Sequence, residues 1–302
     1  MNMQKKRVFL AVVVIIALSV TIAVVSGMLG GNLEKGVMGE KIGVLEISGI
    51  IKDSDEILKQ ISDFGQDGKI KAIIVRIDSP GGAVGPSQEI YSEILKVKKK
   101  KAVVASIGTL GASGGYYIAS AATKIVANPG SITGSIGVII QFFNFQQLLG
   151  KIGVKGNVVK SGEYKDVGSP LRDMTSEERL LMQAVIDDVH SQFVDAVAKG
   201  RNLKKEEVAK IADGRIITGR YAKELKLVDE LGNFNDAVDL TKKLAEIKGE
   251  PKLVYARKKK SALFELLSGF SEGDSKTRLL MLLSEIRIPF YLSNLINSTG
   301  HE

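Results

Sequence analysis

The sequence has no cysteine and no tryptophan, and only two of its 302 residues, His190 and His301, are histidines. The lack of cysteine excludes a disulfide framework, a thiol nucleophile and a cysteine-ligated metal. So few histidines argue against a zinc or iron site, and we expect no metal and no cofactor. Aromatic residues make up 6% of the chain, which is too few to stack bases on a sheet, so we expect no nucleic-acid partner.

Charge is absent from a long segment near the N-terminus. Residues 8–29 are 22 residues without a charge, and they directly follow Lys5, Lys6 and Arg7. A helix of this length crosses a hydrocarbon core of about 30 Å, and the basic cluster places residues 1–7 in the cytoplasm and the rest outside. We therefore predict an uncleaved single-pass anchor in the cytoplasmic membrane. A cleaved signal peptide is the alternative, but its apolar core is typically only about 7 to 15 residues long.

After the anchor, short β-branched runs alternate with helical patterns. Because 44% of the residues are hydrophobic and 25% charged, the chain can bury a sizeable core. Such alternation is typical of an α/β fold with a largely parallel sheet covered on both faces. The expected strands are 42–47, 72–78, 103–107, 124–127, 136–140 and 157–160, and the expected helices are 53–64, 86–97, 114–121, 145–150 and 175–199.

The longest expected helix begins with a capping box, Thr175 followed by Glu178. Its apolar stripe (Met182, Ile186, Val189, Phe193 and Val197) predicts core or subunit contacts. We expect His190, beside this stripe, to be a surface or partly buried histidine. The predicted organisation is a linker at 30–40, a catalytic domain at 41–247 and a tail at 248–302. The apolar stretches of the tail are too short to span a bilayer and suit a packing arm, a membrane-surface helix or an oligomer contact.

Two glycine-rich turns follow neighbouring strands. Residues 78–82 (Asp-Ser-Pro-Gly-Gly) come after one strand, and residues 111–115 (Gly-Ala-Ser-Gly-Gly) come after the next. Consecutive glycines can expose backbone N–H groups to a developing oxyanion, and each such donor contributes about 3 to 4 kcal/mol in known cases. Ser113 lies among small residues at a helix start, so its hydroxyl is a candidate nucleophile. Either turn alone is also an ordinary strand-to-helix connection.

A serine nucleophile needs a base, and no histidine lies between Ser113 and Lys165. A lysine can act as the base only when it is unprotonated, which requires desolvation or neighbouring positive charge. Lys165 is the candidate. The adjacent Asp166 would oppose this state unless its side chain points away. Ser135, in a turn of small residues, could hydrogen-bond the neutral amine.

These pieces together resemble the membrane-anchored signal peptide peptidases of the SppA type, which are serine proteases of the S49 family. The resemblance covers about residues 41–245, and its motifs are residues 78–82, 111–117, 133–137, 161–170, 213–219 and 227–229. It implies a crotonase-like α/β fold shared with the Clp protease proteolytic subunit. It also implies assembly into a homo-oligomer, as a tetramer or octamer, that degrades remnant signal peptides and other unfolded segments outside the cytoplasmic membrane.

The same resemblance implies a role for each motif residue. Ser113 is expected to be the nucleophile, Lys165 the general base and Ser135 the residue that orients the lysine, while Gly82 and Gly114 supply the oxyanion N–H groups. One departure is Lys226, which stands where the family pattern usually has glycine. If that position needs a positive φ, lysine there costs about 1 kcal/mol.

Two other functions remain open from the sequence. A crotonase-fold enzyme acting on acyl-CoA would use a similar oxyanion hole. However, such enzymes usually rely on Glu or Asp and work in the cytoplasm, where CoA is present. A catalytically silent membrane-tethered scaffold is the third possibility, and the presence of both Ser113 and Lys165 argues against it.

Overall fold

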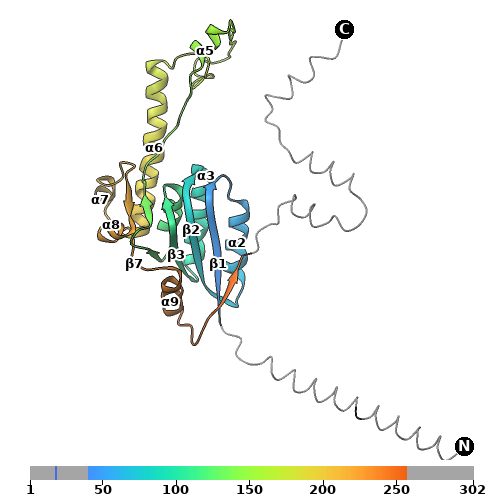
Figure 1. The fold of residues 1–302 in the computed structure, drawn as a ribbon, viewed down its shortest axis with the longest axis vertical. Coiled ribbons are helices and arrows are strands. Elements are labelled where there is room, and N and C mark those ends of the chain that lie inside the picture. The colour runs from blue at the N-terminus through green and yellow to red at the C-terminus, as the bar shows by residue number, and fades with distance from the viewer. Residues whose placement is uncertain (1–17, 19–39, 257–302) are drawn as a thin grey trace, which may run out of the picture. The chain divides into compact units, whose positions relative to one another are not determined.

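The computed structural model describes residue 18 and residues 40–256, and an eight-stranded sheet lies at its centre (Figure 1). Six strands run in the order β6-β5-β3-β2-β1-β8, while β4 pairs with β3, and β7 pairs with β4. The strands are β1 (Lys41–Ile51), β2 (Ile70–Gly82), β3 (Ala102–Ala112), β4 (Lys124–Ala127), β5 (Ile132–Gly134), β6 (Ile216–Thr218), β7 (Glu230–Leu231) and β8 (Lys252–Tyr255). Only the β5–β6 pair is antiparallel among these strands. The predicted α/β class with a largely parallel sheet is confirmed.

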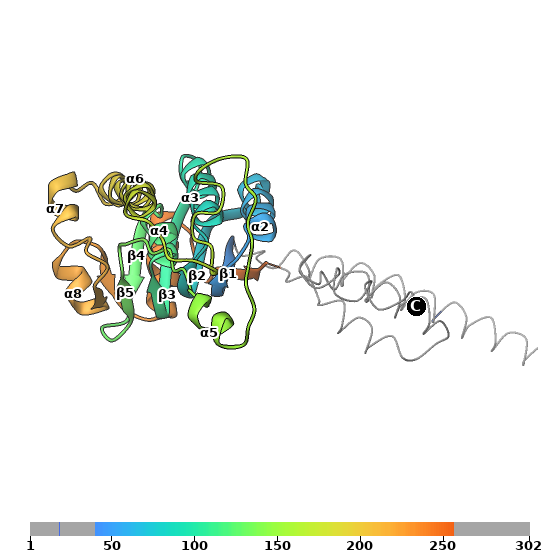
Figure 2. The same ribbon diagram turned by 90° about the horizontal axis from the view of Figure 1, so that it is seen from above.

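Helices cover both faces of this sheet. The described helices are α2 (Asp55–Gln66), α3 (Val84–Lys98), α4 (Gly114–Ser120), α5 (Gln146–Lys151), α6 (Ser176–Arg201), α7 (Lys205–Ala209), α8 (Gly219–Glu224) and α9 (Phe234–Leu244). Successive residues of β2 point to opposite faces. Ile73 and Val75 pack in the main core together with residues of α2, α3 and α4, whereas Ile74 packs with Ile42 against residues of α9. Figure 2 shows α2, α3, α4 and α6 on one side of the strands.

Helix α6 begins at the predicted capping box. The Thr175 hydroxyl accepts a hydrogen bond from the backbone N–H of Glu178, and the Glu178 carboxylate accepts one from the backbone N–H of Thr175. The C-terminal half of the helix packs into the core through Phe193 and Val197. Its N-terminal half projects beyond the sheet and carries the segment with α5 at its far end (Figure 1).

Two expected strands are wrong, those at 136–140 and 157–160. The chain leaves the sheet after β5, and Ser135 takes a positive φ of 49°. Ile136 is still buried, but Ile139 is 87% exposed and Val159 fully exposed. The sequence patterns of these runs are apolar and β-branched, but within residues 40–256 no strand pairs with them.

The described residues contain no helix long and apolar enough to cross a membrane. The predicted anchor at 8–29 falls outside them, apart from residue 18, and so does most of the predicted tail. Within the described range, β8 pairs in parallel with β1 from Lys41 to Val44. The folded body therefore continues past residue 247, where the sequence suggested the end of the catalytic domain.

Candidate active site

Ser113 lies at the sharp turn between β3 and α4. Its φ of 51° and ψ of −124° are unusual for a residue with a side chain. The turn is held from both sides, since the Ser113 N–H donates to the Gly134 carbonyl at 2.9 Å and the Tyr117 N–H donates to the Ser113 carbonyl at 2.8 Å. Strained serines on strand-to-helix turns are typical of hydrolase nucleophiles, because the turn lifts the hydroxyl clear of the backbone.

The glycine turn at the end of β2 packs directly against Ser113. Gly81 has a φ of +95°, and a Cβ placed on it would lie 2.5 Å from the Gly114 nitrogen and 2.9 Å from the Ser113 Cβ. A Cβ on Gly114 would lie 3.3 Å from the Gly82 nitrogen. The backbones of these two turns thus approach each other more closely than side chains would allow. The backbone nitrogens of Gly82 and Gly114 consequently lie close to each other, next to Ser113.

Buried hydrogen bonds stiffen the β2 turn. The hydroxyl of Ser79, which is fully buried, donates to the Gly49 carbonyl at 2.6 Å and accepts from the Gly81 N–H at 3.1 Å. The Asp78 carboxylate accepts from the backbone N–H of Leu110 at 3.1 Å. The turn is therefore tied to β1 on one side and β3 on the other, which preorganises the N–H groups that it presents.

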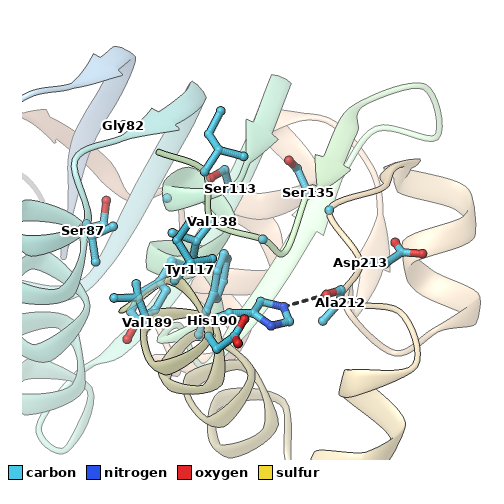
Figure 3. Close-up of a pocket in the computed structure, with 18 of the residues that line it drawn as sticks. Gly82, Ser87, Ser113, Tyr117, Ser135, Val138, Val189, His190, Ala212 and Asp213 are labelled. Carbon is cyan, nitrogen blue, oxygen red and sulfur yellow. Dashed lines mark hydrogen bonds between the residues drawn. The ribbon is translucent and has the colours of Figure 1, made fainter. Parts of the chain in front are cut away.

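Ser113 opens into a cavity of about 580 Å³ between the sheet edge and α6 (Figure 3). Gly82, Gly114 and Ser135 line the same cavity. Its wall is mostly apolar, with Val84, Tyr117, Val138, Ile139, Ile186, Val189 and Phe193. The ring of Tyr117 packs 4.8 Å from Phe193, and burial raises the pKa of its phenol, so the ring stays neutral. Such a cavity suits an apolar substrate side chain.

Ser135 reaches this cavity because the chain turns sharply after β5. Its N–H donates to the Arg215 carbonyl at 2.8 Å, and the Gly214 N–H donates to the Ile136 carbonyl at 3.0 Å. These bonds extend the β5–β6 pairing past the end of β5. The turn thus places a second hydroxyl in the cavity that holds Ser113.

Lys165 does not reach the cavity of its own chain. It is exposed and lies in a turn, where its N–H donates to the Gly162 carbonyl at 3.2 Å. This turn belongs to the segment between β5 and α6, which carries α5 at the far end of α6 (Figure 1). Of the five residues expected at the site, the structure brings together Ser113, Ser135, Gly82 and Gly114, but it leaves Lys165 outside.

His190 was expected to be a surface or partly buried residue, and it is half-buried. We did not expect its ring to line the cavity, where Nε2 lies 2.6 Å from the Ala212 carbonyl oxygen (Figure 3). The sequence signal that could have indicated this position is the spacing of Ile186, Val189, His190 and Phe193, which places these residues on one helix face. Asp187 and Asp213 line the same cavity. Among the described residues no cluster of histidine and carboxylate side chains could hold a metal ion.

The comparisons with known proteins agree with this geometry. The model of peptidase family S49 matches residues 95–248, and that of Clp protease matches residues 43–131. The chain belongs to peptidase family S49. It is therefore a serine-type protease. The match to Clp protease covers most of β1 and all of β2, β3 and β4.

Named relatives cover much of the S49 chain. A candidate protease of Synechocystis is 49% identical over 200 residues, which are 66% of this chain and 72% of that protein. A candidate signal peptide peptidase SppA of Enterococcus faecium is 38% identical over 226 residues, 70% of this chain and 66% of the relative. Protease 4 of Salmonella typhi is 37% identical over 220 residues, but these are only 35% of its length.

Proposed function

We propose that this S49 protease is a membrane-anchored Ser–Lys endopeptidase. Its substrates would be remnant signal peptides and other apolar, unfolded segments on the outer side of the cytoplasmic membrane. The observation that carries the proposal is the placement of Ser113, on a strained turn beside Gly82 and Gly114 and in the lining of a mostly apolar cavity.

In the proposed reaction, the Ser113 Oγ attacks the scissile carbonyl while a neutral lysine amine, that of Lys165, removes its proton. The N–H groups of Gly82 and Gly114 stabilise the oxyanion that forms. The lysine then gives its proton to the leaving amine, and water releases the acyl-enzyme by the same steps. Ser135 would hold the neutral amine by a hydrogen bond.

Because Lys165 lies outside the cavity of its own chain, we propose that the base comes from a second copy in a homo-oligomer, a tetramer or octamer. Large apolar side chains support this assembly, since the segment that carries Lys165 leaves them exposed to solvent. Phe143 is 61% exposed, Ile152 66% and Val159 fully exposed. An exposed apolar surface of this kind is typical of a contact between protein chains.

The substrate class follows from the cavity and from the relatives. The wall formed by Tyr117, Val138 and Phe193 favours apolar side chains such as those of signal-peptide cores. The relative from Enterococcus faecium carries the name of a signal peptide peptidase. An anchor at residues 8–29 would keep the protease in the bilayer, where such fragments collect.

The experiment measures hydrolysis of a fluorogenic apolar peptide by the full-length chain in detergent. Ser113→Ala and Lys165→Ala should each abolish activity, and the activity of the wild type should rise with pH as the base loses its proton. Co-assembly of the two inactive variants in equal amounts should restore about a quarter of the sites, because each chain supplies the group that its neighbour lacks.

Three results would contradict parts of this proposal. Hydrolysis that persists in Lys165→Ala would remove the lysine from the mechanism and move the base to His190, which lines the cavity of Ser113. No recovery on co-assembly would argue against a base from a second copy. Activity that persists in Ser113→Ala would refute the nucleophile itself.

A further inference from the structure

The segment that carries Lys165 is tied to helix α6 by one arginine. Arg172 donates from Nε to one oxygen of the Asp166 carboxylate at 2.8 Å and from Nη2 to the other at 2.9 Å. Its Nη1 donates to Glu178 at 2.8 Å, and Nη2 also contacts the second oxygen of that carboxylate. A single planar guanidinium thus bridges two carboxylates, one next to Lys165 and one in the first turn of α6.

Glu178, the partner of Arg172 on α6, is held in place by its own contacts. The Glu178 side chain is 4% exposed, and the same carboxylate accepts the backbone N–H of Thr175 in the capping box at 3.0 Å. Hydrogen bonds from Arg172 and from Thr175 lower the pKa of Glu178 to about 2. Glu178 is therefore ionised at every pH at which the protease would work, and it remains a fixed acceptor for Arg172.

The Asp166 carboxylate forms ion pairs with residues other than the adjacent Lys165. Lys160 contacts it at 2.6 Å, and the hydrogen bonds from Arg172 and Lys160 hold its pKa far below the usual range. Asp166 is thus an anion with two cationic partners, and neither of them is Lys165. Among the described residues, the Lys165 amine has no hydrogen-bond or ion-pair partner.

We propose that Arg172 is a positioning residue for the reaction: by holding Asp166 against Glu178 it fixes the turn that carries Lys165 and keeps the neighbouring carboxylate occupied. This rests on the proposed function, in which Lys165 is the base. A base must be placed to within a fraction of an ångström, and a bidentate bridge to a buried helix terminus provides such a constraint.

The second effect of Arg172 is electrostatic. An unpaired carboxylate beside Lys165 would favour the charged ammonium, which cannot accept a proton from Ser113. Arg172 and Lys160 compensate the charges of Asp166 and Glu178. The charged groups around this bridge are Lys160, Glu163 and Asp166 on the segment itself, Arg172 and Asp173 in the loop after it, and Glu178 and Arg179 on α6.

The two effects can be separated by three variants of the full-length chain in detergent, with kcat/KM measured from pH 6 to 10. Arg172→Lys keeps the charge but loses the planar fork, so kcat/KM should fall about 10-fold with its pH dependence unchanged. Arg172→Gln removes both, so kcat/KM should fall about 100-fold and its rising limb should move up by about one pH unit. Asp166→Asn keeps the Arg172–Glu178 pair, and its rising limb should move to lower pH because the cations are then in excess.

Arg220→Gln is the matched control, since Arg220 is exposed on α8 and the substitution is the same. It should leave both the rate and the pH profile as in the wild type. Size-exclusion chromatography and thermal unfolding monitor folding and assembly of every variant. If Arg172→Gln does not fold, the opposite shift expected for Asp166→Asn carries the test.

Equal losses in Arg172→Lys and Arg172→Gln without any shift of the pH profile would overturn the proposal, because that pattern indicates a merely structural arginine. Unchanged profiles in both Arg172→Gln and Asp166→Asn would overturn it as well. Lys165→Ala, measured alongside, distinguishes a failure of the proposed function from a failure of the role of Arg172. If it keeps activity, the proposed function fails; if it is inactive while Arg172 and Asp166 have no effect, only the role of Arg172 fails.

Discussion

A single methyl group at Gly81 should disable the active site while leaving the protein folded. In Gly81→Ala, the new Cβ would lie 2.5 Å from the Gly114 nitrogen, whereas ordinary contacts begin near 3.4 Å. The two turns must therefore separate by about 0.9 Å. Because Gly114 is a proposed oxyanion donor and follows Ser113 directly, this displacement falls on two groups that would contact the reacting carbonyl.

The expected magnitude follows from these distances. Loss of one well-placed oxyanion donor costs about 100- to 1000-fold in kcat, and a 1 Å misplacement costs about 100-fold. The φ of +95° adds a backbone strain of about 1 to 2 kcal/mol for alanine. We therefore expect kcat to fall at least about 100-fold with a smaller change in KM, and the melting temperature to fall by about 2 to 8 °C.

Gly85→Ala provides the matched control. Gly85 lies in the first turn of α3, only four residues away, and a Cβ there meets no atom within 4 Å. Peptide hydrolysis by this variant should equal that of the wild type, and its stability should be equal or slightly higher. If Gly81→Ala retains more than a third of the wild-type kcat, or if Gly85→Ala loses as much, the close approach of the two glycine turns does not matter for catalysis.

Two further predictions concern stability. Lys226 has a φ of 61° and is exposed, so Lys226→Gly should raise the free energy of unfolding by about 1 kcal/mol. Lys223→Gly, within α8, should lower it by a similar amount. If both variants lose stability in urea titration, Lys226 is not strained. The folded pKa of Glu178, about 2, lies below its ordinary value near 4.5, so its stabilisation is complete above pH 4.5 and is lost as the pH falls toward 2. The urea midpoint of Glu178→Gln should therefore be lower than that of the wild type at pH 7, and the difference should shrink below pH 4.5; a constant difference would refute this.

Local signals predicted the parts of the fold that local interactions form. The strand 124–127 matches β4, and the capping box of Thr175 and Glu178 starts α6 as expected, because both patterns depend on neighbours within one element. Lys226 has a φ of 61°, so the condition under which lysine in place of the family's glycine costs free energy is met. The run 136–140 misled the prediction, since its apolar residues line the cavity or lie exposed instead of pairing with a strand.

The candidate site was predictable where two turns follow adjacent strands. Parallel strands end at one edge of a sheet, so the turns that contain Gly82 and Ser113 had to meet, and the resemblance to the S49 proteases gave their roles. The position of His190 could not be predicted from the order of the strands. The spacing of residues shows which of them share a helix face, but not which cavity or element that face contacts. Nor could spacing reveal that Lys165 lies outside the cavity of its own chain.

The separation of Ser113 from Lys165 has a physical consequence under the proposed mechanism. Hydrogen bonds to β5 and the packing of two glycine turns fix Ser113, whereas Arg172 and the start of α6 fix the turn that bears Lys165. The serine and the lysine are therefore positioned by different parts of the chain. A single chain would hold a nucleophile without a base. Proteolysis would then require assembly, and a newly made chain would stay inactive until its exposed apolar segment meets another copy.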